Sequence, residues 1–208
     1  MDWDFEIKNL FSKHSTSDAV FCDVGACLGY YTEFFKSMSS DTGRVFAFEI
    51  NPKNLSVLKF LEAENCHIEN LAISDKVETL QVYSDGSSHL SNIIGHDVGY
   101  NQMSSIGQIQ STSLDEYFKN IKVDFLKIDI EGAELKAIKG GINTIKNCKL
   151  VVIECHLDED WKEIYNLLLT HNLKFKNIVN NEDVFYGQTT AIPGRSSIGR
   201  PYQMYLLN

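Results

Sequence analysis

Two glycines and two acids near the start of the chain have the types and spacing of a small-molecule site. An apolar stretch ends in Asp23 and is followed by Gly25 and Gly29, four residues apart, and then by a helical pattern. Gly25 lets the backbone turn tightly and approach a ligand, and Gly29 lets the helix start close to the strand. Glu49 ends the next apolar stretch, where a carboxylate can accept hydrogen bonds from both hydroxyls of a ribose. In this order the residues predict an adenosine-type ligand over the carboxyl ends of the strands.

The glycine spacing discriminates between adenosine ligands. Dinucleotide sites typically carry G-x-G-x-x-G, with the helix start facing a pyrophosphate, whereas this loop has G-x-x-x-G. Asp23, directly before the loop, suits a ligand with positive charge, such as the amino acid ammonium of S-adenosylmethionine. A tight strand-to-helix turn with a buried acid is the alternative that these residues leave open.

The elements around this loop alternate between strands and helices. The predicted strands are residues 19–23, 44–49, 66–69, 78–83, 123–129, 149–155, 174–179 and 202–207, and the predicted helices are 30–38, 51 to about 64, 133–145 with a break at Gly140-Gly141, and 158–170. Residues 123–129 and 149–155 are continuous apolar runs, typical of a parallel sheet that is buried on both faces. The alternation predicts a doubly wound α/β sheet. We expect one domain over residues 1–208, with a helical lead-in over 1–18 and an α/β core over 19–208.

Two polar, glycine-containing segments do not fit this alternation, residues 85–110 and 187–201. Loops of this length in a compact domain are usually functional or mobile. We expect them to form the walls of an acceptor pocket over the later strands, with Arg195 and Arg200 in the second loop; both segments could equally be plain surface loops.

Composition and charge exclude several classes of protein. The chain has 208 residues, a hydrophobic fraction of 43% and a formal net charge of −9, which fits a globular domain and disfavours binding to a phosphate backbone. Five cysteines without a C-x-x-C spacing predict reduced, mostly buried thiols rather than disulfides or a zinc site. The first residues have neither a basic start nor an apolar run, and no apolar run is long enough to span a bilayer, so we expect a cytoplasmic protein with no membrane partner.

Several segments between residues 20 and 156, in the same order as in the family, resemble the FkbM family of S-adenosylmethionine-dependent methyltransferases. They are DVGACLGYYT at 23–32, FAFEINP at 46–52, NLAISD at 70–75, TSLD at 112–115, VDFLKIDIEGAE at 123–134, IKGG at 138–141 and VVIE at 151–154. Of these, KIDIEGAE at 127–134 is the most specific. The resemblance implies a seven-stranded, Rossmann-like methyltransferase sheet with an antiparallel last strand. It also implies methylation of a hydroxyl on a sugar, polyketide or other secondary metabolite.

The resemblance also implies which residues bind the cofactor. Those expected around it are Asp23, Gly25, Ala26, Gly29 and Tyr30 at the methionine end, Glu49 at the ribose, Ile50, Asn70, Leu71 and Ala72 at the adenine, and Asp129 beside the transferring methyl. Two features depart from the family pattern. Cys27 replaces a polar residue in the glycine loop, and Leu71-Ala72 offers no acid for the adenine amine.

An alcohol acceptor must lose a proton, so a base or a metal is expected near the methyl. The predicted catalytic residues are Asp129, Glu154 and His156 at strand ends, with Glu131 as a further candidate. Glu154 and His156 share a face if the strand continues. Alternatively, Glu131 and Glu134 stabilise the dipole of the following helix, and His156 is a hydrogen-bonded histidine at the edge of the core. Asp129 with Glu154 or His156 could hold magnesium, but no fixed ligand spacing supports this, and no metal ligand is predicted.

Two other functions fit the same pattern. A nucleotide-binding oxidoreductase on a similar sheet is disfavoured by the G-x-x-x-G spacing, and a non-catalytic member would bind the cofactor without transferring a methyl group. We expect a small-molecule or glycan acceptor with a hydroxyl, and no nucleic acid. The sequence specifies neither the acceptor nor the oligomeric state.

Overall fold

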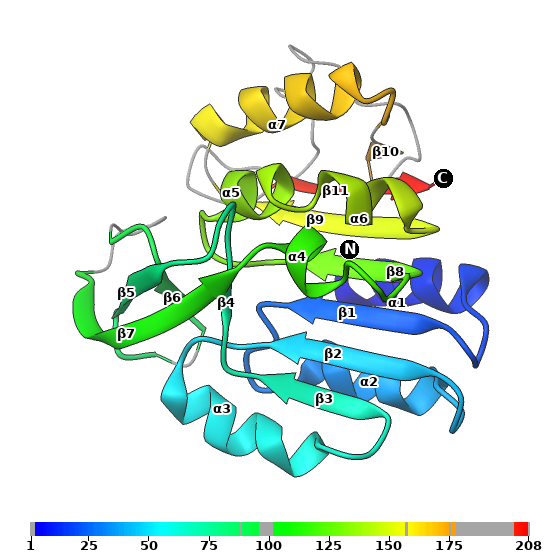
Figure 1. The fold of residues 1–208 in the computed structure, drawn as a ribbon, viewed down its shortest axis with the longest axis horizontal. Helices are drawn as coiled ribbons and strands as arrows, with labels where there is room; N and C mark the ends of the chain where they lie inside the picture. Colours follow the sequence, from blue (N-terminus) through cyan, green and yellow to red (C-terminus); the bar gives the residue numbers. More distant parts are fainter. Residues whose placement is uncertain are drawn as a thin grey trace.

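A seven-stranded sheet forms the centre of the protein in the computed structural model, which describes residues 3–87, 89–95, 102–156, 158–174, 176–177 and 202–207 (Figure 1). Its strands are β1 (Val20–Val24), β2 (Arg44–Phe48), β3 (Cys66–Glu69), β8 (Phe125–Ile128), β9 (Leu150–Cys155), β10 (Lys176–Asn177) and β11 (Tyr202–Leu207). They lie in the order β10-β11-β9-β8-β1-β2-β3. The pairs from β3 to β9 are parallel, and β11 is antiparallel to both β9 and β10. This confirms the predicted sheet and its antiparallel last strand.

Helices cover both faces of this sheet because its strands are apolar on both sides. Along β1, Val20, Cys22 and Val24 face one buried cluster, and Phe21 faces the other. The second cluster contains residues of α1 (Trp3–His14) and α2 (Tyr30–Met38), and there the ring of Phe21 stacks on Phe35 with centroids 5.0 Å apart. The first cluster is covered by α4 (Leu114–Tyr117), α5 (Glu134–Lys139), α6 (Ile142–Asn147) and α7 (Asp158–Thr170). The predicted break at Gly140-Gly141 separates α5 from α6.

The helix after β2 is shorter than predicted. It consists of α3 (Pro52–Leu58) and a 3₁₀ turn, η1 (Lys59–Leu61), instead of running to about residue 64. At its start, the Asn51 side chain accepts a hydrogen bond from the Lys53 N–H at 3.0 Å, and Pro52 occupies the first turn.

A second sheet, which the sequence did not predict, stands beside the carboxyl ends of the central strands (Figure 1). It contains β4 (Ala72–Ile73), β5 (Thr79–Ser84), β6 (Ser91–Asn92) and β7 (Ser104–Thr112), in the order β4-β7-β5-β6. The prediction that residues 85–110 form a loop was therefore wrong, since they contain β6 and most of β7. The cause is the composition of β7, which is largely exposed on both faces and has no apolar alternation.

The other long segment, residues 187–201 with Arg195 and Arg200, lies outside the described residues. Within the described part of the chain, no helix combines the length and the apolar character needed to cross a bilayer.

Candidate active site

A pocket lies where the carboxyl ends of the central strands meet the second sheet. Its walls come from the ends of β1, β2 and β8, from β4, and from the segment that contains β6. The lining residues are Val24, Gly25, Cys27, Phe48, Glu49, Ile50, Asn54, Leu71, Ala72, Ile73, His89, Ser91, Ile93, Asp129, Ile130, Glu131 and Ala133. Acidic groups lie at two places in this lining, Glu49 at the end of β2 and Asp129 with Glu131 after β8.

The glycine loop crosses closely over the end of β8. Gly25 has a φ of +84°, and a Cβ atom at this position would lie 1.7 Å from the main-chain oxygen of Asp129. The N–H groups of Gly25 and Ala26 both donate to the carbonyl of Phe48. Gly29 has a φ of +96°, and a Cβ atom there would lie 2.7 Å from a side-chain carbon of Leu61 and 2.9 Å from one of Leu58. Both glycines are therefore required by contacts within the protein itself.

Glu49 is held rigidly at the end of β2. Its Oε2 accepts a hydrogen bond from the Cys27 N–H at 2.7 Å, and its Oε1 accepts one from the Asn51 N–H at 2.6 Å. The side-chain amide of Asn70 donates to the main-chain oxygen of Glu49 at 2.9 Å. Burial raises the pKa of Glu49 to about 7, although the N–H groups of Asn51 and Cys27 oppose this rise. A carboxylate keeps further lone pairs beyond these two bonds, so Glu49 can still accept from a ligand hydroxyl.

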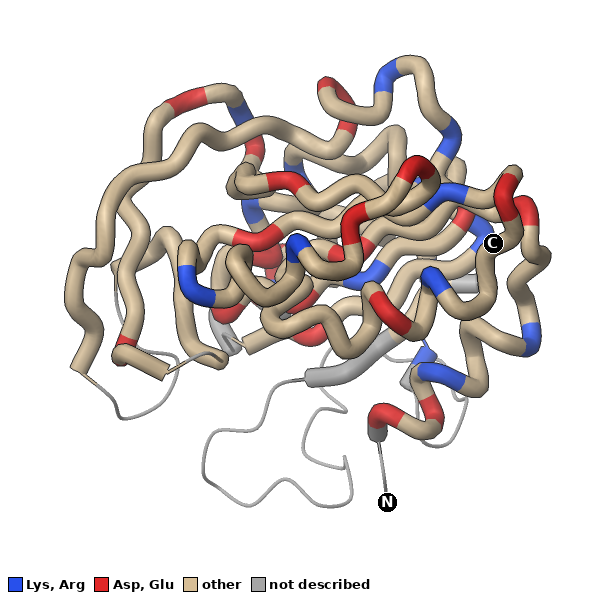
Figure 2. The backbone as a smooth tube through the Cα atoms, turned by 90° about the horizontal axis from the view of Figure 1, so that it is seen from below, with Lys and Arg blue, Asp and Glu red and all other residues tan. Residues whose placement is uncertain are grey.

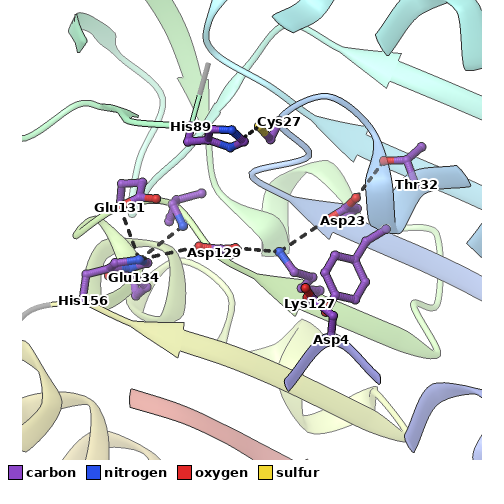
Figure 3. Close-up of polar contacts among 12 residues, drawn as sticks. Asp4, Asp23, Cys27, Thr32, His89, Lys127, Asp129, Glu131, Glu134 and His156 are labelled. Carbon is purple, nitrogen blue, oxygen red and sulfur yellow. Dashed lines mark hydrogen bonds and ion pairs between the residues drawn. The ribbon is translucent and has the colours of Figure 1, made fainter. Parts of the chain in front are cut away.

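A buried lysine separates the two aspartates that end β1 and β8. Lys127 Nζ lies 3.0 Å from Asp129 Oδ2 and 4.0 Å from Asp23 Oδ1 (Figure 3). Thr32 donates to the other oxygen of Asp23 at 2.7 Å. Burial lowers the pKa of Lys127, but the carboxylates of Asp129 and Asp23 outweigh this and raise it. Asp23 is fully buried and does not line the pocket, and its role in holding the cofactor stays a prediction.

The loop between β8 and α5 is held by hydrogen bonds to the carboxylate of Glu134, and this residue is completely buried. Glu134 Oε1 accepts hydrogen bonds from the N–H groups of Gly132 at 3.0 Å and Ile130 at 3.3 Å. The same oxygen lies 2.9 Å from His156 Nδ1. Glu131, in the middle of this loop, has a φ of +54° and precedes α5. The interpretation of Glu131 as a helix-dipole residue was therefore wrong, because the helix starts three residues later.

His156 lies among carboxylates at the end of β9 (Figure 3). Its Nε2 is 3.3 Å from Glu131 Oε2 and 3.8 Å from Asp129 Oδ1, while Nδ1 faces Glu134. Burial lowers the pKa of His156, but Glu134, Glu131 and Asp129 together raise it to about 10. Protonated imidazole donates from both nitrogens and cannot accept a proton. The carboxylates that face both nitrogens therefore favour the protonated ring and argue against the predicted role of His156 as a base.

Three of the predicted residues also have a spacing that a metal ion could bridge. One ligand atom from each of Asp129, Glu154 and His156 lies within 4.8 Å of the others. Both nitrogens of His156, however, already face carboxylates, and a metal would have to displace these ion pairs. The residues therefore fit an ion-pair network better than a metal centre.

The structure brings together about half of the predicted cofactor residues. Those that line the pocket are Gly25, Glu49, Ile50, Leu71, Ala72 and Asp129, and those that do not are Asp23, Ala26, Gly29, Tyr30 and Asn70. Of the latter, Tyr30 is exposed and its ring lies under Lys8 Nζ at 3.5 Å. Glu154 and His156 lie behind Asp129 and Glu131 and do not themselves line the pocket.

Sequence reasoning assigned no role to Lys127, and it singled out no individual residue in the segment that precedes and forms β6. The signal for Lys127 was a single charged residue inside the apolar strand Phe125–Ile128. Before β6, His89 lies with Nδ1 3.8 Å from Cys27 Sγ, and in the strand Ser91 accepts a hydrogen bond from the Asn51 side chain at 3.0 Å. His89 and Ser91 thus line the pocket beside the glycine loop and the helix that follows Glu49, and the acceptor wall expected of residues 85–110 stays a prediction.

Known proteins resemble this chain either in sequence or in fold. The chain is 27% identical over 182 residues to the hexuronic acid methyltransferase AglP of Haloferax volcanii, covering 86% of this chain and 73% of AglP. Its fold is similar to that of an O-methyltransferase from Bacillus cereus in complex with S-adenosylhomocysteine, with a TM-score of 0.53, 9% identity, and coverage of 100% of this chain and 82% of that one. It is also similar to M. capricolum TrmK in complex with S-adenosylhomocysteine, with a TM-score of 0.51, 12% identity, and coverage of 97% and 67%.

These structural likenesses concern the fold alone, but the family follows from the sequence. The methyltransferase FkbM domain matches residues 23–176, which is most of the chain and contains every strand end that lines the pocket. The chain belongs to the FkbM-domain family of methyltransferases.

Proposed function

We propose that this protein transfers the methyl group of S-adenosylmethionine to a hydroxyl group of a sugar or other small metabolite. The observation that carries this proposal is the pocket between Glu49 and Asp129, which has a fixed carboxylate at one end and an acidic cluster at the other. S-adenosylmethionine has a ribose with two hydroxyls and a positively charged sulfur. The carboxylate of Glu49 can accept hydrogen bonds from the ribose hydroxyls, and the acidic cluster at the other end can stabilise the positive charge on sulfur.

The described residues fit this cofactor. Glu49 would accept hydrogen bonds from the ribose hydroxyls, and the apolar side chains of Ile50, Leu71 and Ile73 would pack on the adenine. Asp129 would lie on the sulfonium side, where Lys127 fixes one of its oxygens at 3.0 Å. When bound, the cofactor supplies an electrophilic methyl group. The protein residues supply orientation, which alone can contribute effective molarities up to about 10⁵–10⁸ M in model reactions.

A hydroxylated sugar is the acceptor class that the similarity to AglP favours, since that relative is named a hexuronic acid methyltransferase. The charge of the chain supports a small acceptor rather than a nucleic acid. Figure 2 shows Lys and Arg spread among Asp and Glu in the described part of the chain, with no continuous basic stripe in that view. With a net charge of −9, non-specific binding to phosphate backbones is disfavoured.

Binding and turnover distinguish this proposal from its alternatives. Calorimetry should show binding of S-adenosylmethionine but not of NAD, which would exclude a nucleotide-dependent oxidoreductase. Glu49→Gln should weaken this binding by about 10-fold or more, because a hydrogen bond to a charged group contributes about 1.5–3 kcal/mol. Glu62→Gln, the same change at an exposed position after η1, serves as the control.

The second measurement is transfer of a labelled methyl group to sugars with and without a carboxylate. Formation of S-adenosylhomocysteine together with a base-stable methyl ether would support O-methylation of a hydroxyl. A base-labile ester would show methylation of a carboxylate instead. Tight cofactor binding without turnover on any acceptor would favour the non-catalytic alternative.

A further inference from the structure

Glu131, in the loop after β8, lines the pocket and has a backbone conformation that its surroundings impose. It lines the pocket beside Asp129, and its side chain is 22% exposed. Its φ of +54° lies in the left-handed region, which is uncommon for a residue with a side chain. Strained conformations of this kind persist where the surroundings impose them and cluster at active sites. Here the surrounding constraint is visible, because the N–H groups on both sides of Glu131 donate to the buried carboxylate of Glu134.

Two residues behind Glu131 determine where its carboxylate lies. Glu134 is fully buried and faces His156 Nδ1 at 2.9 Å. Because a carboxylate accepts hydrogen bonds, Nδ1 carries a proton, and the ring is oriented with Nε2 toward Glu131 Oε2 at 3.3 Å. The chain Glu134–His156–Glu131 thus runs from the interior to the pocket, and its middle member is a cation.

The other acids near this place are less able to take a proton from a ligand. Asp129 is held on the buried ammonium of Lys127, which lies 3.0 Å from its Oδ2. Glu154 does not line the pocket. Both nitrogens of His156 face carboxylates, which favours the protonated ring.

We propose that Glu131 is the catalytic base of the reaction, and that His156 and Glu134 are positioning residues that hold its carboxylate at the pocket. This assignment rests on the proposed function, methylation of a hydroxyl. The acceptor O–H bond breaks, its proton moves to a carboxylate oxygen of Glu131, and the oxygen electron pair forms the new O–CH₃ bond, while the electrons of the C–S bond remain on sulfur as a neutral thioether. Glu131 then releases the proton to solvent.

The surroundings of Glu131 adjust its basicity to this task. Burial raises its pKa, the neighbouring carboxylates of Asp129, Glu154 and Glu134 add to this rise, and His156 opposes it, giving a value of about 7. A base is most effective when its pKa lies near the working pH. Removal of the His156 cation should therefore make Glu131 protonate at a higher pH.

The first test is Glu131→Gln, assayed with methyl β-glucuronoside and methyl β-glucoside as acceptors. We expect turnover at saturating S-adenosylmethionine to fall by about 10²–10⁴-fold, a far larger loss than any change in the affinity for S-adenosylmethionine that calorimetry shows. Glu163→Gln is the matched control, because Glu163 is an exposed carboxylate on α7 that forms an ion pair with Lys139. Normal turnover of Glu131→Gln would overturn the assignment.

The second test separates positioning from a merely structural role of His156. In wild type, the rate should decline as the pH falls through about 7. In His156→Asn, this decline should begin at a higher pH, because the cation that favours ionised Glu131 is gone. A uniform loss of rate at all pH values would show that His156 only supports the fold.

The third test needs no acceptor. In protein with ¹⁵N-labelled histidine, the His156 ring, assigned with His156→Asn, should be protonated on both nitrogens at pH 8. Its titration midpoint should fall in Glu131→Gln. If wild type methylates neither sugar, the proposed function is contradicted for these acceptors, whereas a His156 ring that is neutral at pH 7 or is insensitive to Glu131→Gln overturns the present assignment.

Discussion

The ammonium of Lys127 lies 3.0 Å from the carboxylate of Asp129, two residues further along the same chain segment, and is almost completely buried. A buried cation needs a compensating charge, and Lys127 has Asp23 as a second partner on the neighbouring strand β1, directly opposite in the register. The strand ends beneath the pocket are therefore joined by one charge network.

Lys127→Met tests this network. The substitution keeps the apolar stem of the side chain and removes the charge, leaving Asp23 and Asp129 without their cation. Breaking a buried ion pair by removing one partner costs about 3–5 kcal/mol, and we expect a loss of this size in the free energy of unfolding measured with urea. Adding Asp23→Asn to Lys127→Met should recover part of the loss, since one of the two uncompensated charges disappears. An unchanged free energy of unfolding in the single variant would contradict a structural role for the ion pair.

Gly25→Ala tests the contact between the glycine loop and the end of β8. A left-handed residue with a side chain costs about 1–2 kcal/mol, and here the Cβ atom would also collide with the main-chain oxygen of Asp129. Gly86→Ala is the matched control, because Gly86 has a similar φ of +91° and nothing lies within 4 Å of its Cβ position. Thermal unfolding should show a clearly larger destabilisation for Gly25→Ala. Equal losses in the two variants would mean that the loop tolerates a side chain.

His89→Ala tests whether the segment before β6 forms a wall of the cofactor site. His89 lines the pocket and lies beside Cys27 of the glycine loop. Loss of a ring that covers a ligand removes about 1 kcal/mol of contact energy, which corresponds to roughly fivefold weaker binding of S-adenosylmethionine. His14→Ala on α1, outside the pocket lining, should leave the affinity unchanged. If both variants bind equally well, the segment does not contact the cofactor.

The central sheet could be predicted from the sequence because the patterns that specify its strands lie within short stretches of the chain. Asp23, Glu49 and Asp129 each directly follow or end an apolar run, and parallel strands bring their carboxyl ends to one edge. The cap of α4 is equally local, since the Ser113 hydroxyl accepts a hydrogen bond from the Glu116 N–H at 3.2 Å. These features follow from the order of residues without knowledge of tertiary contacts.

The sequence could not predict the interactions that depend on distant parts of the chain. Glu134 has the position of a helix-dipole residue, yet its carboxylate turns back to the loop before it and meets His156, 22 residues away. The same is true of β7, whose exposed residues show no apolar pattern and which forms a strand by pairing with β5. In both cases the partner, rather than the local pattern, determines the structure.

The pH dependence of cofactor binding tests the role of Glu49. Its pKa of about 7 lies above the usual value of 4.5, so the folded protein binds the Glu49 proton more tightly than the unfolded chain does. The contribution of this group to stability therefore falls as the pH rises from about 4.5 to 7. Ligand hydroxyls donate to the ionised carboxylate, so affinity should change in the opposite direction. A group with a pKa of about 7 is roughly nine-tenths protonated at pH 6.

We therefore expect S-adenosylmethionine to bind about tenfold more weakly at pH 6 than at pH 8. Glu49→Gln should bind weakly at both pH values, because glutamine cannot ionise. Calorimetry at the two pH values on wild type and Glu49→Gln measures this difference directly. A tenfold pH effect that persists in Glu49→Gln would assign the titration to another group, with Glu131 as the first candidate because its pKa is also raised to about 7. The double variant Glu49→Gln/Glu131→Gln would then identify the group, since it should lose the pH dependence completely.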